Sequence, residues 1–450
     1  MSAPDLSLLV KRRFGPVFVV MFLGAFNDNL LKFALLFLAN FVLYADEPGK
    51  GEILATVATG LFILPYFLFS AIAGQCADAL DKTKLMRVVK SAEVVIMGLG
   101  LAGFWMESVP LLLGALFLLG VHSAFFGPIK YAILPQHLRP HEIMGGTGLV
   151  EAGTFLAVLG GQLLAGVIPP REAGLVASAL AVSGFLASLA VPSAPAMAPN
   201  LRISRNIFVS TWEILKVARH GPGVWPSILG ISWFFSVGAV LLAELAPLVS
   251  GTLGASQQVA TLFLLIFSVS VALGSMLVNR LLGGEVSARY VPASALALAA
   301  LLIDLSLAAR AYVGEVPDAS IGEFMDSGGS WRIVIDLAGI ALAGGMFIVP
   351  LYAILQTHSP PTERSRTIAA NNIVNAAIVV LSVAVVTLML ALGSSVAGVI
   401  GALGFATLAV AGLFCWFLPD AAMRPMLRRL FRRYRTNSSA SPDTKPASDK

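Results

Sequence analysis

The sequence predicts an all-α membrane protein with twelve transmembrane helices, and three observations support this prediction. Of the 450 residues, 57% are hydrophobic and 12% are charged, whereas roughly 25% of a soluble domain is charged. The apolar residues suffice for about a dozen bilayer crossings of about 20 residues each. The basic residues also gather on one side of those crossings. This composition excludes a soluble enzyme, a nucleic-acid-binding protein and a disordered chain.

Apolar runs bounded by turn-forming or charged residues place the helices in two sets of six, because proline and glycine clusters interrupt helices. The first set is expected at residues 14–43, 53–74, 85–106, 110–134, 141–167 and 172–191. The second set is expected at residues 223–249, 257–280, 289–312, 331–356, 364–391 and 395–418. We therefore divide the chain into a bundle at 1–191, a cytoplasmic linker at 192–222, a bundle at 223–419 and a basic tail with a disordered end at 420–450.

The basic residues orient the helices. With twelve crossings, 25 of the 30 lysines and arginines fall on the side of the two termini, while Lys32 lies inside the first helix. The opposite side holds four, which are Lys50, Arg171, Arg310 and Arg332. Because basic loops remain in the cytoplasm, we expect both termini to be cytoplasmic. The basic run at 11–13 precedes an apolar stretch too long for a cleavable signal.

Two segments outside the crossings are candidates for contact with the cytoplasmic membrane surface. In the linker, Phe208, Trp212 and Leu215 share one helical face, which is typical of an amphipathic helix on a leaflet; an ordinary connector is an equal alternative. The segment Arg424–Arg435 carries six arginines. Such a segment attracts anionic lipids, or it serves solely to anchor the last helix.

The loop after the second helix carries a motif. Gly74, Asp78 and Lys82 match the signature loop of the major facilitator superfamily, which this segment resembles, whereas Asp81 and Thr83 depart from it. A small residue allows two helices to pack closely, and an acid at a helix end can hold two halves of a protein together. The resemblance implies a transporter of two six-helix bundles, with these residues at its gate.

Five further stretches resemble the bacterial lysophospholipid transporter family, over roughly residues 10–420. The resemblance is strongest to the transporter portion of proteins in which this domain is fused to acyltransferase modules. It implies movement of lysophospholipid, typically lysophosphatidylethanolamine, from the outer to the inner leaflet of a bacterial inner membrane, where a separate acyltransferase could reacylate it. The stretches are Phe22–Lys32, Phe126–Pro135, Gly230–Phe234, Gly344–Gln356 and Ile368–Ala376.

Ionisable residues inside a bilayer crossing are costly and therefore indicate function. Asp28 lies near the middle of the first helix, flanked by Asn27 and Asn29, with Lys32 one turn further on. We expect Asp28 to face a cavity and bind a cationic ammonium head group, and its three polar neighbours to belong to the same site. The alternative is an Asp28–Lys32 pair that neutralises itself.

Three further charged residues are candidates for the transport pathway. Lys130 could contact a lipid phosphate as a compact charge, form a latch with a carboxylate, or extend to the membrane interface. Glu151 could bond across helices, take up a proton, or pair with Lys130. Glu244 could meet the amine end of an incoming lipid. Some relatives carry an arginine near this last position, so the resemblance leaves the substrate preference open.

The remaining polar residues of the crossings are weaker candidates. One group could bind glycerol hydroxyls or phosphate oxygens, or hydrogen-bond helices to one another: Gln356, Asn371, Asn372 and Asn375. A second group is isolated in the sequence, so one internal hydrogen bond could satisfy each member: Glu93, His122 and Asp304.

Two other functions are alternatives to lipid transport. A proton-coupled exporter of amphiphilic drugs would have the same fold and would depend on titration of Asp28 or Glu151. A membrane acyltransferase usually shows His-x₄-Asp, and none of the five histidines has it. Cys76 and Cys415 lie far apart without metal-ligand spacing, and no phosphate loop or nucleophile elbow appears. The sequence thus predicts a transporter rather than an enzyme, with no cofactor and no metal.

Overall fold

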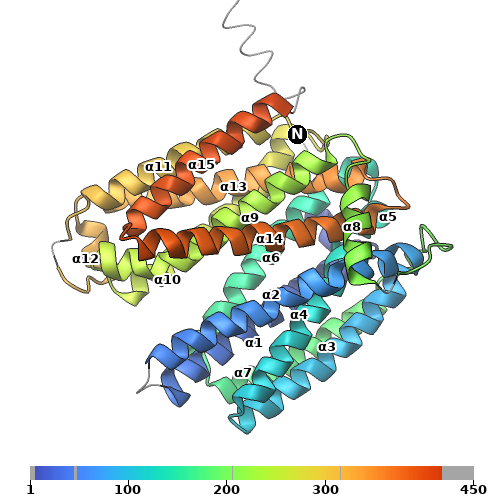
Figure 1. Cartoon of the computed structure of the whole chain (residues 1–450), viewed down its shortest axis with the longest axis horizontal. Helices are drawn as coiled ribbons and strands as arrows, with labels where there is room; N and C mark the ends of the chain where they lie inside the picture. Colours follow the sequence, from blue (N-terminus) through green and yellow to red (C-terminus); the bar gives the residue numbers. More distant parts are fainter. Residues whose placement is uncertain (1–5, 45–47, 205, 315, 418–450) are drawn as a thin grey trace, which may run out of the picture.

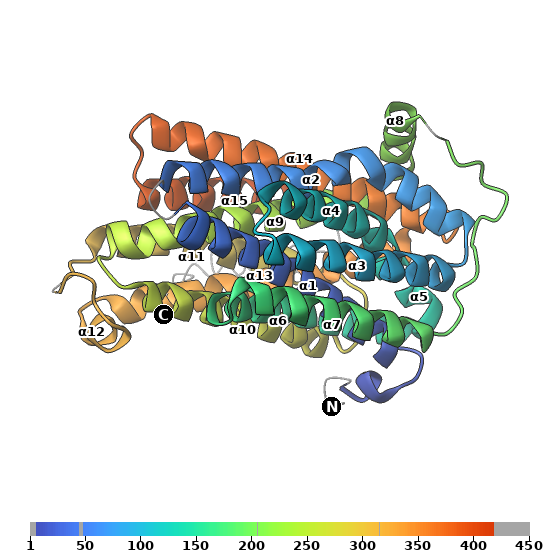
Figure 2. The same cartoon turned by 90° about the horizontal axis from the view of Figure 1, so that it is seen from below.

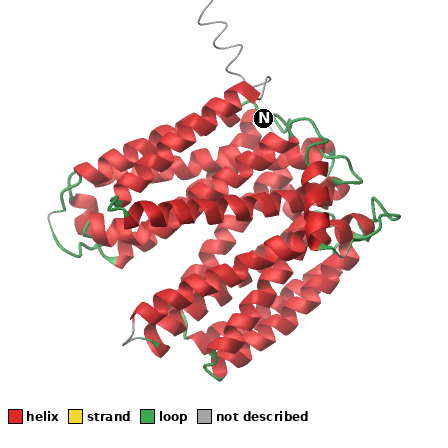
Figure 3. Cartoon of the chain, viewed as in Figure 1, coloured by secondary structure: helices red, strands yellow, loops and turns green. Residues whose placement is uncertain are grey.

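The structure is a computed structural model and describes residues 6–44, 48–204, 206–314 and 316–417. Within these ranges the long elements are helices (Figure 3), and twelve of them are long and apolar enough to cross a membrane. The prediction of twelve transmembrane helices is therefore confirmed. The predicted basic tail at 420–450 lies outside the described residues.

The crossings agree with the ranges expected from the sequence to within a few residues at most ends. The first bundle contains α1 (Gly15–Leu38), α2 (Pro48–Ala79), α3 (Lys82–Trp105), α4 (Val109–Ala132), α6 (Ile143–Val167) and α7 (Pro170–Leu189). The second contains α9 (Val224–Pro247), α10 (Gln257–Leu282), α11 (Val291–Ala311), α13 (Ser330–His358), α14 (Arg364–Ala391) and α15 (Val396–Phe417). Three short helices lie between successive crossings, namely α5 (Leu134–His137), α8 (Ile207–Val217) and α12 (Ile321–Asp326).

Local sequence explains the sharp ends of these helices. The side chain of Asp81 accepts hydrogen bonds from the N–H groups of Thr83 at 2.9 Å and Lys84 at 3.0 Å, and so caps α3. Such a cap stabilises a helix by about 1 kcal/mol. It also accounts for an acid where the major facilitator motif prefers glycine. At its C-terminal end, α10 stops at Gly283, whose φ of 60° suits glycine best.

The two bundles repeat the same packing. In the first bundle α1 packs on α6, α2 on α4 and α3 on α7; in the second, α9 packs on α14, α10 on α13 and α11 on α15 (Figures 1 and 2). The first helix of each bundle also ends in a five-residue π-helical segment, Ala39–Leu43 after α1 and Leu248–Thr252 after α9. This internal repeat is a general feature of transporter folds, in which the site lies between the repeats.

The bundles meet at the end that carries the linker. There α2 packs on α14 and α6 on α10, while the ribbons diverge toward the end that carries α12 (Figure 1). Small residues permit the close approach. A Cβ atom added at Gly148 of α6 would lie 2.7 Å from the carbonyl oxygen of Ser275 in α10. The interface therefore closes one end of the molecule and leaves the bundles apart at the other.

The linker crosses this closed end. Its helix α8 contacts both α2 and α14 and stands clear of the other helices (Figure 2). Within α8, Ser210 and Ile214 are buried, whereas Phe208 is 87% exposed and Trp212 is 64% exposed. Asn206 caps its first turn by accepting the N–H of Val209. The linker thus contains an amphipathic helix, and its contact with a membrane surface stays a prediction.

The three charged residues that are isolated in the sequence each have an internal partner in the structure, as expected. Glu93 of α3 pairs with Lys90, which lies one turn away in the same helix and is fully buried. His122 of α4 contacts the same carboxylate. Asp304 is paired with Arg332, with a contact of 2.5 Å. The sequence could not show these partners because two of the three pairs join residues from different helices.

Candidate functional site

A cavity of about 400 Å³ lies between the two bundles. Helices α1, α2, α4 and α6 form one wall, and α9, α13 and α14 form the other. Aromatic and aliphatic side chains make up most of the lining, which suits the cavity to an amphiphilic molecule. Its polar lining is drawn from both bundles and comprises Asp28, Asn29, Tyr66, His122, Ser123, Lys130, Tyr131, Thr154, Tyr352, Asn372 and Asn375.

Asp28 supplies the negative charge of the cavity wall. One carboxylate oxygen, Oδ2, accepts a hydrogen bond of 2.8 Å from the hydroxyl of Ser123 in α4. The other oxygen, Oδ1, is buried and has no hydrogen-bond partner among the described residues. No ion pair joins Asp28 to Lys32 within the part of the chain that the structure describes, so the self-neutralising alternative is wrong. The Lys32 ammonium instead lies 5.9 Å from the centroid of the Phe33 ring.

Lys130 supplies the positive charge of the same cavity. Its ammonium donates a hydrogen bond of 2.8 Å to the hydroxyl of Thr154 in α6 and lies 5.0 Å from the centroid of the Tyr131 ring. It also interacts electrostatically with Asp28 and Glu151. Because Lys130 lines the cavity within α4, it does not extend to the membrane interface. A fixed anion and a fixed cation therefore face one cavity.

A pair of stacked tyrosines joins the bundles beside Lys130. The rings of Tyr131 in α4 and Tyr352 in α13 lie 4.1 Å apart at an angle of 11°. Behind them, Glu151 is buried and accepts a hydrogen bond of 2.6 Å from the Tyr131 hydroxyl. Glu151 thus bonds across helices, which is one of the roles expected for it, and it positions the tyrosine instead of facing the cavity.

The structure brings some of the predicted residues together and separates others. Asp28, Asn29, Lys130, Asn372 and Asn375 line the cavity. Outside its lining lie Asn27, which donates to Glu93 at 3.0 Å, and Gln356, which donates to Thr147 of the other bundle at 3.1 Å. Lys32, Glu151, Glu244 and Asn371 also lie outside the lining.

Sequence reasoning missed several polar residues of the lining. Tyr66, Ser123 and Thr154 belong to common residue types with no spacing that marks them, so one sequence held no signal for them. Tyr131 and Tyr352 lie within stretches that resemble lysophospholipid transporters. That resemblance could have identified both tyrosines as candidates.

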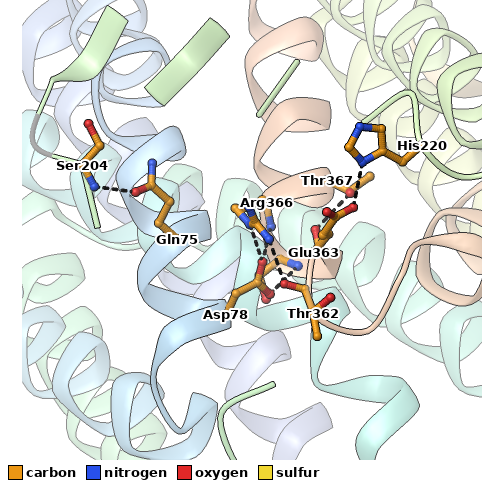
Figure 4. A network of polar contacts seen from close by, with 9 residues as sticks. Gln75, Asp78, Ser204, His220, Thr362, Glu363, Arg366 and Thr367 are labelled. Carbon is orange, nitrogen blue, oxygen red and sulfur yellow. Dashed lines mark hydrogen bonds and ion pairs between the residues drawn. The ribbon is translucent and has the colours of Figure 1, made fainter. Parts of the chain in front are cut away.

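The motif residue Asp78 fastens the closed end (Figure 4). Its buried carboxylate accepts hydrogen bonds from the N–H of Ser365 at 2.9 Å, the N–H of Arg366 at 3.2 Å and the guanidinium Nε of Arg366 at 3.1 Å. All three donors belong to the first turn of α14, where the exposed N–H groups of a helix favour an anion. One side chain of the first bundle therefore holds the start of a helix in the second.

The other two motif residues lie beside this contact. Lys82 is buried, and its ammonium has no hydrogen-bond partner among the described residues. Gly74 lies directly against α14, because a Cβ atom added there would be 2.6 Å from the Cβ of Ala369 and 3.0 Å from the Cα of Arg366. Its missing side chain is what allows α2 and α14 to touch.

We expect Gly74→Leu to hold the two helices apart at the closed end. The added side chain has no room against Ala369 and the α14 backbone, so the closed arrangement should be destabilised by about 1–3 kcal/mol. Disulfide trapping between cysteines placed at the starts of α3 and α14 should then slow at least severalfold. Gly60→Leu in the same helix is the control, because a Cβ atom there meets nothing within 4 Å; equal slowing in both variants would contradict this role for Gly74.

The linker contacts both bundles, and Figure 4 shows one contact on each side of α8. The N–H of Ser204 donates to the side-chain oxygen of Gln75 in α2 at 2.8 Å. The ring of His220 lies 3.0 Å from the carboxylate of Glu363, the residue before α14. The linker therefore contacts α2 through a residue before α8, and the start of α14 through a residue after α8.

Known proteins resemble this chain over most of its length. The family model described as Major Facilitator Superfamily matches residues 17–381. Lysophospholipid transporter LplT of Citrobacter koseri is 28% identical over 415 residues, which cover 89% of this chain and 94% of that protein. The protein of the same name from Salmonella newport is 29% identical and covers 76% of this chain and 78% of its own.

Solved structures agree with this fold. The human organic anion transporter MFSD10 superposes with a TM-score of 0.73 at 16% identity and covers 89% of this chain and 98% of its own. The Escherichia coli fucose:proton symporter FucP superposes with a TM-score of 0.62, also at 16% identity, with the same coverage. At such identities these neighbours show the fold alone. Together with the twelve helices in two bundles, the family match shows that this chain belongs to the Major Facilitator Superfamily.

Proposed function

We propose that this protein is a secondary transporter that moves lysophospholipid, in particular lysophosphatidylethanolamine, from the outer to the inner leaflet of a bacterial inner membrane by alternating access. The observation that carries the proposal is the pair of opposite charges in one largely apolar cavity. Asp28 offers a carboxylate and Lys130 an ammonium. A zwitterionic head group has the complementary ammonium and phosphate.

Each part of the lipid finds a matching surface. The unpartnered Oδ1 of Asp28 accepts the ethanolamine ammonium, since a buried carboxylate gains most from a cationic partner. Lys130 meets the phosphate and exchanges its neutral hydroxyl partner for an anion. Asn372 and Asn375 lie on the opposite wall and offer amides to the glycerol hydroxyl. The head group is thus held without any covalent step.

The acyl chain requires an apolar path next to the head group. The cavity lining includes Phe62, Phe235 and Val379. On α14, Leu381 is 64% exposed and Leu388 is 60% exposed, so the helix that carries Asn375 also presents apolar surface toward its far end. A single chain can lie along this surface, because hydrocarbon gains about 0.8 kcal/mol for each buried methylene.

The distribution of basic residues supports the direction. With the linker and termini in the cytoplasm, the contact between Asp78 and α14 closes the cytoplasmic end, and the bundles diverge toward the outer leaflet. The structure then corresponds to a state that receives lipid from outside. Opening of the cytoplasmic contact would release it to the inner leaflet.

Two partners follow from this orientation. Anionic lipids of the cytoplasmic leaflet would lie against α8, where Trp212 is exposed beside Lys216, whose ammonium is 5.4 Å from the indole ring, and against the basic tail. A lysophospholipid that reaches the inner leaflet is also the substrate of an acyltransferase. A separate acyltransferase is therefore the partner that would consume the product.

The proposal is tested with the purified protein in liposomes. Labelled lysophosphatidylethanolamine is added outside, and inward movement is followed with and without a proton gradient. We expect movement well above that of protein-free liposomes. If the lipid does not move under either condition, lipid transport is excluded. If a generic cationic dye moves in its place, the protein is a drug exporter instead.

A further inference from the structure

The first bundle contains a buried cluster of ionisable groups directly behind the Asp28 wall of the cavity. Glu93 of α3 is 1% exposed and binds three partners through its two oxygens. Its Oε2 pairs with the ammonium of Lys90 and lies 3.2 Å from Nε2 of His122. Its Oε1 accepts a hydrogen bond of 3.0 Å from Asn27, which stands next to Asp28 in α1. The cluster therefore connects three helices.

The surroundings are shaped to hold these groups. A Cβ atom added at Gly24 of α1 would lie 3.1 Å from the Lys90 ammonium, and one added at Gly184 of α7 would lie 3.2 Å from its Cε. The ring of Phe126 stacks on that of His122 at 5.9 Å and lies 5.4 Å from the Lys90 ammonium. Two glycines and one aromatic ring thus make room for a lysine that is fully buried.

His122 links this cluster to the cavity. It lines the cavity, and its neighbour in sequence, Ser123, holds Asp28. Neither imidazole nitrogen has a hydrogen-bond partner among the described residues, although Nε2 lies 3.2 Å from the Glu93 carboxylate. The ring also interacts electrostatically with the Asp28 carboxylate. It is therefore placed between two acids, Glu93 behind the wall and Asp28 within it.

With a neutral imidazole and an ionised Asp28, the cluster lacks one positive charge. With a neutral imidazole, the positive charge of Lys90 faces the negative charges of Glu93 and Asp28. A net charge in a region of low dielectric constant is costly. A proton on His122 restores the balance, and so does an ammonium group bound to Asp28. Either cation neutralises the same excess of negative charge. Protonation of His122 therefore disfavours binding of the ammonium, and binding of the ammonium disfavours protonation.

We infer that His122 is a proton-binding site whose proton competes with the cationic group of the transported molecule, so that binding of an ammonium at Asp28 releases a proton from His122. The inference deepens the proposed function, on which it rests for the ammonium. The step is a proton transfer: the N–H bond of the imidazolium breaks, its electron pair stays on the ring nitrogen, and a water molecule takes up the proton as the ammonium enters.

The neighbouring charged residues of α7 and the cavity lysine lie away from His122. The helix α7 carries charges only in its first turn, at Arg171 and Glu172, and Arg171 is paired there with Glu107. Lys130 lies two turns further along α4. The titratable groups around the cluster are Asp28 from α1, Tyr66 from α2, Lys90 and Glu93 from α3, and His122 from α4.

The test measures proton release on binding by the purified full chain in weakly buffered detergent solution. Two probes are titrated with a pH indicator present: lysophosphatidylethanolamine, and dodecyltrimethylammonium, which has a cationic group but no phosphate. Each bound probe should release a proton. Affinity for both probes should fall severalfold as the pH is lowered from about 8 to about 6.

Two variants decide the source of the proton. In His122→Gln both the release and the pH dependence should disappear, whereas His137→Gln, in the same bundle but at its closed end, should behave as the wild type. Release that persists in His122→Gln, or binding without release in the wild type, would overturn the inference. If only dodecyltrimethylammonium binds and releases a proton, the lipid substrate is wrong and the proton site stands. If neither probe binds, both proposals fail.

Discussion

Replacing Asp28 with asparagine should lower the affinity for lysophosphatidylethanolamine about tenfold to a hundredfold. The substitution keeps the shape of the side chain and an acceptor for the Ser123 hydroxyl, which bonds at 2.8 Å, but it removes the charge that faces the ammonium. A hydrogen bond to a charged group contributes about 1.5–3 kcal/mol, which corresponds to that range of affinities. The measurement is binding and inward transport of the labelled lipid, normalised to the amount of folded protein.

Glu244→Gln is a matched control for this prediction. It also removes a buried carboxylate from a crossing, but Glu244 lies in α9 outside the cavity lining. We expect its transport rate to stay within about twofold of the wild type. Equal losses in the two variants would show a general cost of removing a buried charge, and would contradict a specific role for Asp28.

Asp78→Ala should open the closed end of the molecule. The carboxylate accepts three hydrogen bonds from the first turn of α14, and its removal leaves the guanidinium of Arg366 without its buried partner. Breaking such a contact costs about 3 kcal/mol, enough to shift the ratio of closed to open molecules about a hundredfold. Spin labels at Lys84 and Thr362, in a background without Cys76 and Cys415, should therefore show a new population at longer distance.

The acid three positions further on provides the control. Asp81 caps α3 within its own bundle and accepts the hydroxyl of Ser193 at 2.7 Å. Asp81→Ala should thus lower helix stability without changing the distance between labels. The gate assignment is contradicted if Asp81→Ala lengthens the distance as much as Asp78→Ala does, or if Asp78→Ala leaves it unchanged.

The sequence was sufficient to predict the fold because a membrane allows few kinds of spanning structure. Each crossing must be a continuous apolar helix, so the runs themselves predicted the helices, and several ends fall at residues such as Asp81 and Gly283 that terminate helices by their own chemistry. The motif at Gly74 and Asp78 likewise predicted a contact between the two halves. The pairing of Lys90 with Glu93 was not predicted, because a basic residue near the end of an apolar run gives no sign of whether it is paired.

The cavity was only partly predictable. Asp28 and Lys130 stood out because charges are rare within the crossings, and both line the cavity. Asn27 and Asn29 are two positions apart in α1, so their side chains point to different faces of the helix. Asn27 therefore contacts Glu93 and lies outside the cavity. Glu93 and His122 belong to different helices, so their contact depends on how α3 packs on α4. Helical periodicity gives the face of a helix, but which neighbour that face meets is set by tertiary packing.

The central claim is that the carboxylate of Asp28 holds the ammonium of the lipid, and covalent capture tests it most directly. A carbodiimide joins a carboxylate to a primary amine with loss of water, so it can couple Asp28 to bound lysophosphatidylethanolamine. Mass spectrometry of the treated protein should show one lipid attached to the peptide that contains Asp28. Lysophosphatidylcholine, whose amine is quaternary, should block this coupling without being coupled itself. Capture at other carboxylates alone, or unchanged capture in Asp28→Asn, would contradict the claim.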